Sequence, residues 1–310
     1  MRTLLFGKDG QLGREFIPHL NVFSEVLAVG RNECDLSCEE NIQALIEQFR
    51  PDLIINASAY TAVDQAEKDA NTALQINALA PTAMAKSAQR LNSAMVHYST
   101  DYVFDGLKQG AYEELDSCNP LSVYGSTKLQ GEHGVSANCV RHLIFRTSWV
   151  FSAHGSNFLK TILKLAATKE DLRVIDDQWG APTSTELIVR VSLQALGMNA
   201  VIKNKEPPGD QTIQPMPQWG IFNLVAGGET NWHAYAQYVV SLAQELGMGD
   251  KFLLDATKIN PIPSKDYPQL APRPLNSRLS TKKIRKAFNL NISDWREGVQ
   301  AELQKIKIQG

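Results

Sequence analysis

Residues 3–13 read TLLFGKDGQLG, a short apolar run followed by three glycines spaced three residues apart. Glycines placed directly after a strand allow a tight turn, a close approach of the backbone to a pyrophosphate, and close packing of helix on sheet. The free N–H groups at the start of the next helix then face the anion. The residues that we expect to contact a dinucleotide here are Gly7, Gly10, Gln11, Leu12 and Gly13.

The rest of the first half alternates short apolar runs with stretches of helical composition. Continuous apolar runs of this length are typical of strands that are covered on both faces, as in a parallel sheet. The repeated order of strand and helix predicts a Rossmann-type α/β fold, a doubly wound parallel sheet with right-handed crossovers. Beyond the first run, strands are predicted at 25–29, 53–56, 94–98 and 142–145, and helices at 36–49 and 66–91, the latter restarting at Pro81.

The pattern changes after about residue 150. Residues 171–183 predict a strand-and-loop segment, 186–196 a helix and 220–225 a strand. Proline-rich stretches at 207–217 and 260–274 predict loops. We therefore expect a dinucleotide-binding domain over 1–150 and a smaller α/β substrate-binding lobe mainly over 151–310, with elements near 185–200 and 219–226 returning to the first domain.

Composition narrows the class of protein. The chain has 310 residues, a formal net charge of −2 and 43% hydrophobic residues, and it carries no long basic run. A nucleic-acid partner is therefore not expected, and no segment reaches membrane-spanning length without charges. The four cysteines form no CxxC pair, which indicates free thiols in a reducing compartment and hence the cytoplasm. They are Cys34, Cys38, Cys118 and Cys139.

The residue after the second predicted strand bears on cofactor choice. Dinucleotide sites selective for NAD place an acid about 20 residues beyond the glycine turn, where it binds the ribose hydroxyls. Here Arg31 follows Gly30, and its guanidinium suits a 2′-phosphate. Glu33 lies close by, so NADPH is favoured and NADH stays the alternative. An ordinary exposed loop arginine is the competing interpretation.

A phenol and an ammonium stand four residues apart at Tyr124 and Lys128, on one face of a predicted helix. A nearby ammonium favours the phenolate, so we expect a lowered pKa for Tyr124 and proton exchange with a carbonyl or alcohol oxygen. Thr100 follows the fourth predicted strand, at the sheet edge where ligands bind in such folds. Its hydroxyl is placed to bind the same substrate oxygen.

Together these features resemble the extended short-chain dehydrogenases/reductases, and within them the dTDP-4-dehydrorhamnose reductases. The resemblance spans nearly the whole chain. Long strings carry it more specifically than the glycine turn does. They are INASAYTAVD at 55–64, STDYVFDG at 99–106, RTSWVF at 146–151, DDQWGAPT at 176–183, the segment 223–232, and RPLNSRL at 273–279.

The resemblance implies an NAD(P)H-dependent reduction of the C4 keto group of dTDP-4-dehydro-L-rhamnose. It makes Tyr124 the proton donor to O4, with Thr100 beside it and Lys128 holding the nicotinamide ribose. Ala57, Ser58 and Ala59 would line the cofactor's ribose and phosphates, and Asp35 and Leu36 would flank the adenine. The residues implied as sugar contacts are Thr61, Val63, Thr100, Tyr102 and Trp149.

The same resemblance bears on metal and assembly. Some members of the family dimerise around Mg²⁺ through glutamates, and Glu15 and Glu186 stand at two of those positions. No third glutamate matches, and an exposed helix glutamate is the commoner reason for either residue. The chain is expected as a monomer or a homodimer.

Two other function classes stay open. Nucleotide-sugar 4,6-dehydratases and epimerases share this scaffold, but the dehydratases carry Thr-Asp-Glu where this chain has Thr100-Asp101-Tyr102. The glutamate that water elimination needs is thus absent from that position. A non-catalytic regulatory subunit would keep the glycine turn and need no intact Thr100, Tyr124 and Lys128. The preferred nucleotide and sugar stereoisomer do not follow from the sequence.

Overall fold

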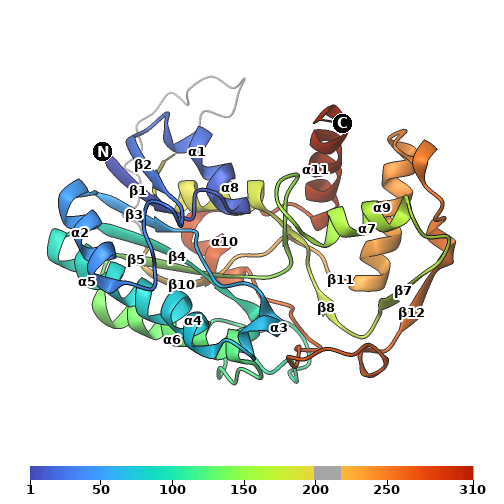
Figure 1. Cartoon of the computed structure of the whole chain (residues 1–310), viewed down its shortest axis with the longest axis horizontal. Coiled ribbons are helices and arrows are strands. Elements are labelled where there is room, and N and C mark those ends of the chain that lie inside the picture. The colour runs from blue at the N-terminus through green and yellow to red at the C-terminus, as the bar shows by residue number, and fades with distance from the viewer. Residues whose placement is uncertain (199–217, 310) are drawn as a thin grey trace.

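The computed structural model describes residues 1–198 and 218–309, and its centre is a six-stranded sheet in which all paired strands are parallel (Figure 1). The strand order is β10-β5-β4-β3-β1-β2. The fold is therefore the doubly wound α/β sheet that the sequence predicts. The strands are β1 (Arg2–Phe6), β2 (Glu25–Val29), β3 (Leu53–Asn56), β4 (Ala94–Thr100), β5 (His142–Thr147) and β10 (Gly220–Asn223).

The strand order reverses next to β1, which pairs with β2 on one side and β3 on the other. After β1 the chain crosses to β2 on one side, and after β3 it crosses to β4 on the other side. Such a switch point opens a crevice beyond the carboxyl ends of the strands, and ligands of open α/β sheets bind there. The glycine turn after β1 and residues 57–59 after β3 border this crevice.

Helices cover both faces of the sheet. On one face lie α1 (Gln11–Leu20) and α8 (Thr185–Ala195), and on the other lie α2 (Glu39–Phe49), α5 (Ala80–Leu91) and α6 (Val123–Asn138) (Figure 1). Each buries an apolar face against the strands, as Phe16 and Leu20 do in α1. Because α8 packs on α1 and β10 pairs with β5, residues beyond 150 complete this layered unit.

The second half surrounds α9 (Trp232–Glu245), with α7 (Phe158–Ala166) and α11 (Trp295–Gln309) beside it (Figure 1). Three small strand pairs tie its segments together: β7 (Leu172–Ile175) with β12 (Ile259–Ile262), β8 (Trp179–Gly180) with β11 (Thr230–Asn231), and β6 (Val150–Phe151) with β9 (Thr183–Ser184). The remaining helices are α3 (Val63–Ala66), α4 (Ala70–Leu74), α10 (Lys282–Phe288), the π turn Gln75–Leu79 and short 3₁₀ turns at Asp101–Val103, Gly249–Lys251, Ala256–Lys258 and Ser264–Asp266.

Two local predictions differ from the structure, and a third is not tested by it. The helix expected over 66–91 is broken after Ala66, resumes as α4 and runs through the π turn into α5, which begins at Ala80 next to Pro81. The loop expected over 260–274 contains part of β12, because β7 supplies a partner strand from far away in the sequence. The proline-rich loop predicted at 207–217 lies outside the described residues.

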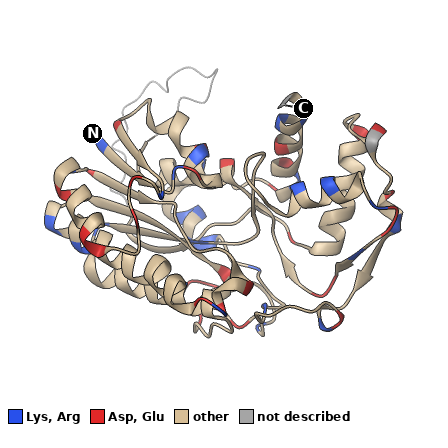
Figure 2. Ribbon diagram, in the orientation of Figure 1, with Lys and Arg blue, Asp and Glu red and all other residues tan. Residues whose placement is uncertain are grey.

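No helix among the described residues is long and apolar enough to cross a membrane. All four cysteines are free thiols, in agreement with the absence of paired spacing in the sequence. Acidic and basic residues are both scattered along the ribbon in Figure 2.

Candidate active site

The turn between β1 and α1 depends on two of its glycines. Gly7 has φ +87°, and a Cβ on it would lie 2.8 Å from the Ser58 backbone nitrogen. A Cβ on Gly13 would lie 2.1 Å from the Gly7 carbonyl oxygen. Gly10 caps α1 without a side chain, which leaves the first N–H groups of the helix to a ligand. The turn therefore forms a cradle for an anion such as a pyrophosphate.

Gln11 begins α1, and its side chain turns toward the second half. Its Oε1 accepts hydrogen bonds from Ser152 Oγ at 3.1 Å and Asn157 Nδ2 at 2.9 Å. Leu12 packs against the main hydrophobic core instead. The backbone of both residues lies at the start of α1, so a contact with the cofactor would come from the main chain.

The residues after β2 form the far rim of the cradle. Arg31 is exposed, directly after Gly30. Glu33 accepts hydrogen bonds from the Gly30 N–H at 2.8 Å and from Lys8 Nζ. The Lys8 hydrogen bond holds the pKa of Glu33 below its usual range. Glu33, the acid that could bind the ribose of NADH, is thus already hydrogen-bonded to Lys8 and Gly30, whereas the guanidinium of Arg31 is exposed to solvent.

The remaining residues expected around the cofactor lie in two places, after β3 and after β2. Ala57, Ser58 and Ala59 lie half-buried along the crevice after β3. Asp35 turns its carboxylate to the backbone and hydroxyl of Ser37, and Leu36 packs against the smaller core on the α2 side of the sheet.

Thr100 and Tyr124 meet at the carboxyl end of β4. The Thr100 hydroxyl donates to Asp101 Oδ1 at 3.0 Å and accepts the Tyr102 N–H at 3.2 Å, and it lies close enough to the Tyr124 hydroxyl to lower the pKa of that group. The rings of Tyr124 and Tyr102 pack edge to face with centroids 5.4 Å apart. The structure thus brings together three residues that the sequence assigned to the substrate side.

Helix α6 reaches this position because small residues face the segment after β4. A Cβ on Gly125 would lie 2.2 Å from the Tyr102 carbonyl oxygen, so only glycine permits this approach. Ser122 caps the helix by accepting the Gly125 N–H at 3.2 Å, and Glu67 accepts the Val123 N–H at 2.9 Å. These caps fix the first turn of α6, which carries Tyr124.

The pKa of Tyr124 differs in direction from the expectation. Burial raises it to about 12, and the Thr100 hydrogen bond offsets only part of that rise. The expected lowering needs an ammonium beside the phenol, but Lys128 Nζ points into the sheet and donates to the Tyr98 carbonyl at 2.6 Å. Burial in turn lowers the pKa of Lys128 to about 8. A phenol that stays protonated at neutral pH can act as an acid.

Three polar groups at this site gave no motif in the sequence. Asp101 is buried, and burial raises its pKa to about 6. Asn56 and His97 are buried beneath Lys128 on β3 and β4. The available signal was a polar residue within an otherwise apolar central strand, as His97 is within AMVHY.

Trp149 faces the other side of the crevice in a strained backbone conformation. Its φ is +49°, which is rare for a bulky residue. Its indole stacks on Trp232 with centroids 3.6 Å apart, and a Cβ on Gly180 would lie 2.8 Å from it. Strained backbones concentrate at ligand sites.

Thr61 is exposed and Val63 half-buried at the start of α3. Next to them, Asp64 accepts two hydrogen bonds from Arg273, at 3.0 and 2.8 Å, and the Ala271 N–H. The Arg273 side chain holds the pKa of Asp64 down at about 2. This ion pair joins the sheet unit to the extended segment 263–275.

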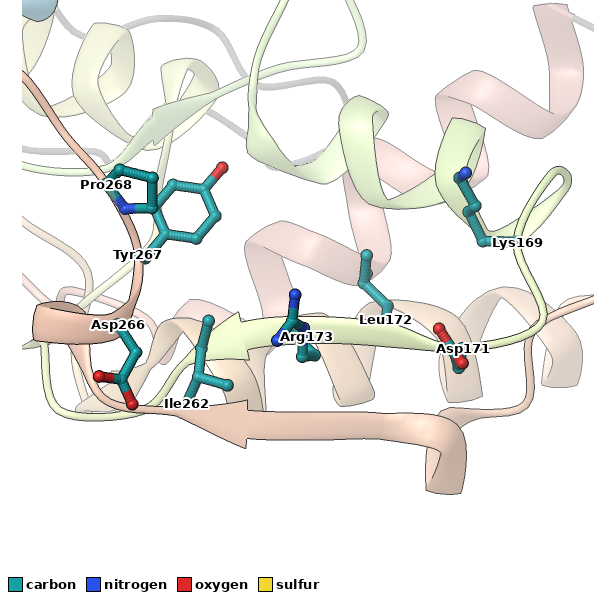
Figure 3. Close-up of a pocket in the computed structure, with 8 residues that line it drawn as sticks. All are labelled: Lys169, Asp171, Leu172, Arg173, Ile262, Asp266, Tyr267 and Pro268. Atoms are coloured by element: carbon teal, nitrogen blue, oxygen red, sulfur yellow. The ribbon is translucent and has the colours of Figure 1, made fainter.

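Two shallow hollows of about 370 and 400 Å³ lie along that segment. Figure 3 shows the first, along β7 and β12, with Tyr267 and Pro268 at one end and Lys169 and Asp171 at the other. The second hollow shares Tyr267 and Pro268 and reaches Arg273. It therefore approaches the Asp64–Arg273 pair, whereas the first is remote from Tyr124.

The two glutamates expected at a metal site are engaged elsewhere. Glu186 accepts from Lys305 Nζ at 2.8 Å, and Glu15 accepts from Thr185 Oγ1 at 3.3 Å. Lys305 also donates to the buried Glu302 at 2.8 Å. Within 1–198 and 218–309, no group of three or more candidate ligands could hold a metal ion. Of the two glutamates expected at a metal site, Glu186 is thus paired with the Lys305 ammonium.

Comparisons with known proteins agree with this geometry. The family model described as the RmlD substrate binding domain matches residues 1–308. A dTDP-4-dehydrorhamnose reductase of Shigella flexneri is 41% identical over 310 residues, covering 99% of this chain and 98% of the relative. A crystal structure of such a reductase from Clostridium acetobutylicum matches with a TM-score of 0.86 and 30% identity over 99% of this chain and 100% of that one. One from Bacillus anthracis, solved with NADP, matches with a TM-score of 0.85 and 26% identity over 100% and 99%.

Proposed function

Because this chain belongs to the dTDP-4-dehydrorhamnose reductase family, we propose that it reduces the C4 keto group of dTDP-4-dehydro-L-rhamnose to the alcohol of dTDP-L-rhamnose, with NADPH as the reductant. The observation that carries the proposal is the meeting of the Tyr124 and Thr100 side chains at the carboxyl end of β4, the edge of the sheet where ligands of such folds bind. A carbonyl oxygen placed there has the Tyr124 phenol within reach as a proton donor.

Tyr124 acts as the general acid in this proposal. Its raised pKa keeps the phenol protonated at neutral pH, which suits a group that must give its proton to O4 as C4 is reduced. Thr100 lies beside that phenol, and its hydroxyl is held in place by donating to Asp101. NADPH, when bound, supplies the hydride.

The residues of the cradle fit that cofactor. Gly7 and Gly13 leave no room for a Cβ, and the start of α1 offers free N–H groups to the phosphates. Gly10, Gln11 and Leu12 would contribute main-chain contacts there. Ala57, Ser58 and Ala59 would border the ribose, with Asp35 and Leu36 on the adenine side.

We assign the 2′-phosphate to Arg31, which is exposed beside the crevice while Glu33 is paired with Lys8. A phosphate can accept from the guanidinium without displacing an existing partner. NADH remains a second reductant, and we expect it to be used less well. Lys128 would hold the nicotinamide ribose.

Thr61, Val63, Tyr102 and Trp149, all within the first 150 residues, would contact the sugar, with the aromatic rings of Tyr102 and Trp149 offering apolar surface. An apolar ring face suits a 6-deoxy sugar, whose methyl group lacks a hydroxyl. We place cofactor binding on residues 1–150 with α8 and β10, and expect the rest of 151–310 mainly to form the lobe that completes the substrate site.

The proposal includes neither a metal nor a fixed assembly. The Lys305 ammonium contacts Glu186 and Glu302, so these carboxylates do not fit a Mg²⁺ site as they stand. All the proposed catalytic groups lie within one chain, so a monomer could carry the reaction and a homodimer is equally compatible. The four free cysteines are in keeping with the cytoplasm.

The test is NADPH oxidation, followed by absorbance, with the purified protein and keto-sugar generated in a coupled reaction. We expect oxidation that depends on the keto-sugar, faster with NADPH than with NADH. Tyr124→Phe should lose roughly 10²–10⁴-fold in turnover while it still binds NADPH. Tyr238→Phe, which removes a hydroxyl from α9, is the matched control and should turn over like the wild type.

The alternatives give different results. Folded protein that binds NADPH but oxidises none with the keto-sugar would support a regulatory subunit or another sugar. An epimerase would co-purify with tightly bound NAD⁺. Loss of water from a dTDP-hexose would indicate a dehydratase, which the tyrosine at position 102 disfavours.

A further inference from the structure

His97 lies in the middle of β4, fully buried beneath the proposed active site. Its two ring nitrogens face two different polar side chains. Nδ1 lies 3.1 Å from Asn56 Nδ2, and Nε2 lies 3.4 Å from Lys128 Nζ. All three side chains are buried, so the protonation of each group is set by its neighbours.

The orientation of the Asn56 amide group determines which of its atoms faces His97 Nδ1. Asn56 Oδ1 accepts the backbone N–H of Ser58 at 3.1 Å and also the Ser58 hydroxyl. A backbone N–H can only donate, so the atom that faces it must be the amide oxygen. The Asn56 NH₂ group therefore points at His97 and donates to Nδ1.

The His97 tautomer follows. Because Nδ1 accepts a hydrogen bond, it carries no proton, and a neutral imidazole then carries its proton on Nε2. Burial lowers the pKa of His97 well below its usual value, which excludes the doubly protonated ring near neutral pH. Nε2–H is thus a donor, and it faces Lys128 Nζ.

An ammonium has no lone pair and cannot accept this hydrogen bond. A neutral amine can accept it, and can donate at the same time to the Tyr98 carbonyl 2.6 Å away. We propose that His97 is a positioning residue that stabilises the neutral amine form of Lys128 in the ligand-free enzyme, through a hydrogen bond from Nε2–H to Nζ, so that Lys128 gives up its proton more readily. The mechanistic meaning of this state rests on the function proposed above.

Other charged groups near Lys128 do not reverse this preference. Glu132, one turn along α6, is the nearest acid, but it is bound by Arg146 through three hydrogen bonds of 2.7–3.2 Å. Asp101 and Tyr124 lie on the substrate side, and Tyr98 contributes its backbone carbonyl. Burial lowers the pKa of Lys128 to about 8, so the ammonium predominates at pH 7 and the amine above about pH 8, and burial acts in the same direction as the His97 hydrogen bond.

The consequence is a lysine whose charge changes within the working pH range. Removing the His97 donor removes the hydrogen bond that stabilises the amine and also the N–H that opposes the ammonium. Both effects favour the charged form, so the pKa of Lys128 should rise. A merely structural role for His97 would alter stability and leave this pKa in place.

The experiment uses ligand-free, full-length protein labelled at lysine Cε and at the histidine ring nitrogens, titrated by NMR. We expect His97 to show the Nε2–H tautomer and Lys128 to titrate near 8. His97→Leu should raise the Lys128 pKa by about one unit or more. Met95→Leu, a volume-conserving change two residues earlier on the same face of β4, is the control and should leave that pKa unchanged.

Asn56→Asp provides a second variant that retains the ring. A carboxylate at 56 accepts from Ser58 and from His97 Nδ1–H, so the tautomer should switch and Nε2 should accept from a charged Lys128. Wild-type His97 protonated on Nδ1, or a Lys128 pKa equal in His97→Leu and Met95→Leu, would overturn the proposal. Neither readout requires turnover, so an enzyme inactive on the keto-sugar would refute the proposed function and leave this inference standing.

Discussion

At the scale of one residue, Asp101 is a carboxyl group that the site buries away from solvent. Its carboxyl accepts the Thr100 hydroxyl and is otherwise buried, with Oδ2 lacking a hydrogen-bond partner in the structure. Burial raises its pKa from 3.8 to about 6. The charged form is therefore the costly one, and the hydrogen bond that it accepts from the Thr100 hydroxyl offsets part of that cost.

The pH dependence of stability follows from this direction. A carboxyl whose folded-state pKa is raised contributes most below its unfolded pKa, and that contribution is lost as pH rises through about 6. Asp101→Asn keeps an acceptor for Thr100 and cannot ionise. Its unfolding free energy relative to the wild type should therefore grow by roughly 1–3 kcal/mol between about pH 4 and pH 7, measured by urea denaturation.

The control for this prediction is Asp52→Asn, which removes the charge of an exposed carboxyl group and should show no such trend with pH. A stability difference for Asp101→Asn that stays constant over the same pH range would show that the Asp101 carboxyl titrates normally.

At the scale of elements, the turn from β1 into α1 combines a left-handed residue with a close contact. Gly7 and Gly110 have nearly the same backbone, with φ of +87° and +86°. They differ in surroundings, because a Cβ on Gly7 meets the backbone of 57–58 and a Cβ on Gly110 meets nothing within 4 Å. Comparing alanine substitutions at Gly7 and Gly110 therefore distinguishes the effect of strain in φ from the effect of a side chain that obstructs the crevice.

Gly7→Ala should therefore weaken NADPH binding by about tenfold or more, since about 1.4 kcal/mol suffices for that change. Gly110→Ala carries the same backbone strain and should lower stability without altering the dissociation constant. Fluorescence titration with NADPH measures both. Equal affinities for the two variants would remove the turn from the cofactor site.

Local signals explain which elements were predictable. The glycine turn, the apolar runs and the Tyr124–Lys128 spacing are all encoded within a few residues, and the structure contains the corresponding strands and helices. β12 was missed because its partner β7 lies far away in the sequence, and prolines argue locally for a loop. The π turn at 75–79 likewise depends on α6, where Gly131 admits the Asn77 carbonyl.

The direction in which the Lys128 side chain points could not be predicted from the sequence either. A spacing of four places two side chains on one helix face but does not choose a rotamer. The choice comes from Tyr98 and His97 on β4, which accept or offer hydrogen bonds only once the sheet has formed.

At the scale of the whole molecule, Lys305 joins α11 to the rest of the chain. Its ammonium contacts Glu186 on α8 and Glu302 on its own helix, and Glu302 also accepts the Ala153 N–H. Glu302 is 1% exposed, so it depends on these partners for its charge. The C-terminal helix is thus tied to α8 of the sheet unit and to the segment after β6.

Lys305→Met should destabilise the protein by roughly 1–3 kcal/mol, seen as a lower Tm, because a buried carboxylate loses its cation. Lys282→Met, on the exposed surface of α10, is the control and should leave Tm within about a degree. EDTA should change neither the activity nor the Tm of the wild type. Activity lost to EDTA and restored by Mg²⁺ would place a metal among these glutamates after all.

The stacked pair Trp149 and Trp232 has a consequence for how this enzyme can diversify. The left-handed backbone at 149, the indole beneath it and the missing side chain at 180 come from three separate segments, and each tolerates the others as they are. A larger residue at 180 has nowhere to go while Trp149 stays, and a smaller one at 149 leaves Trp232 uncovered. A change of sugar specificity at this part of the site would therefore need substitutions at several of these positions together. A single substitution there would not be tolerated.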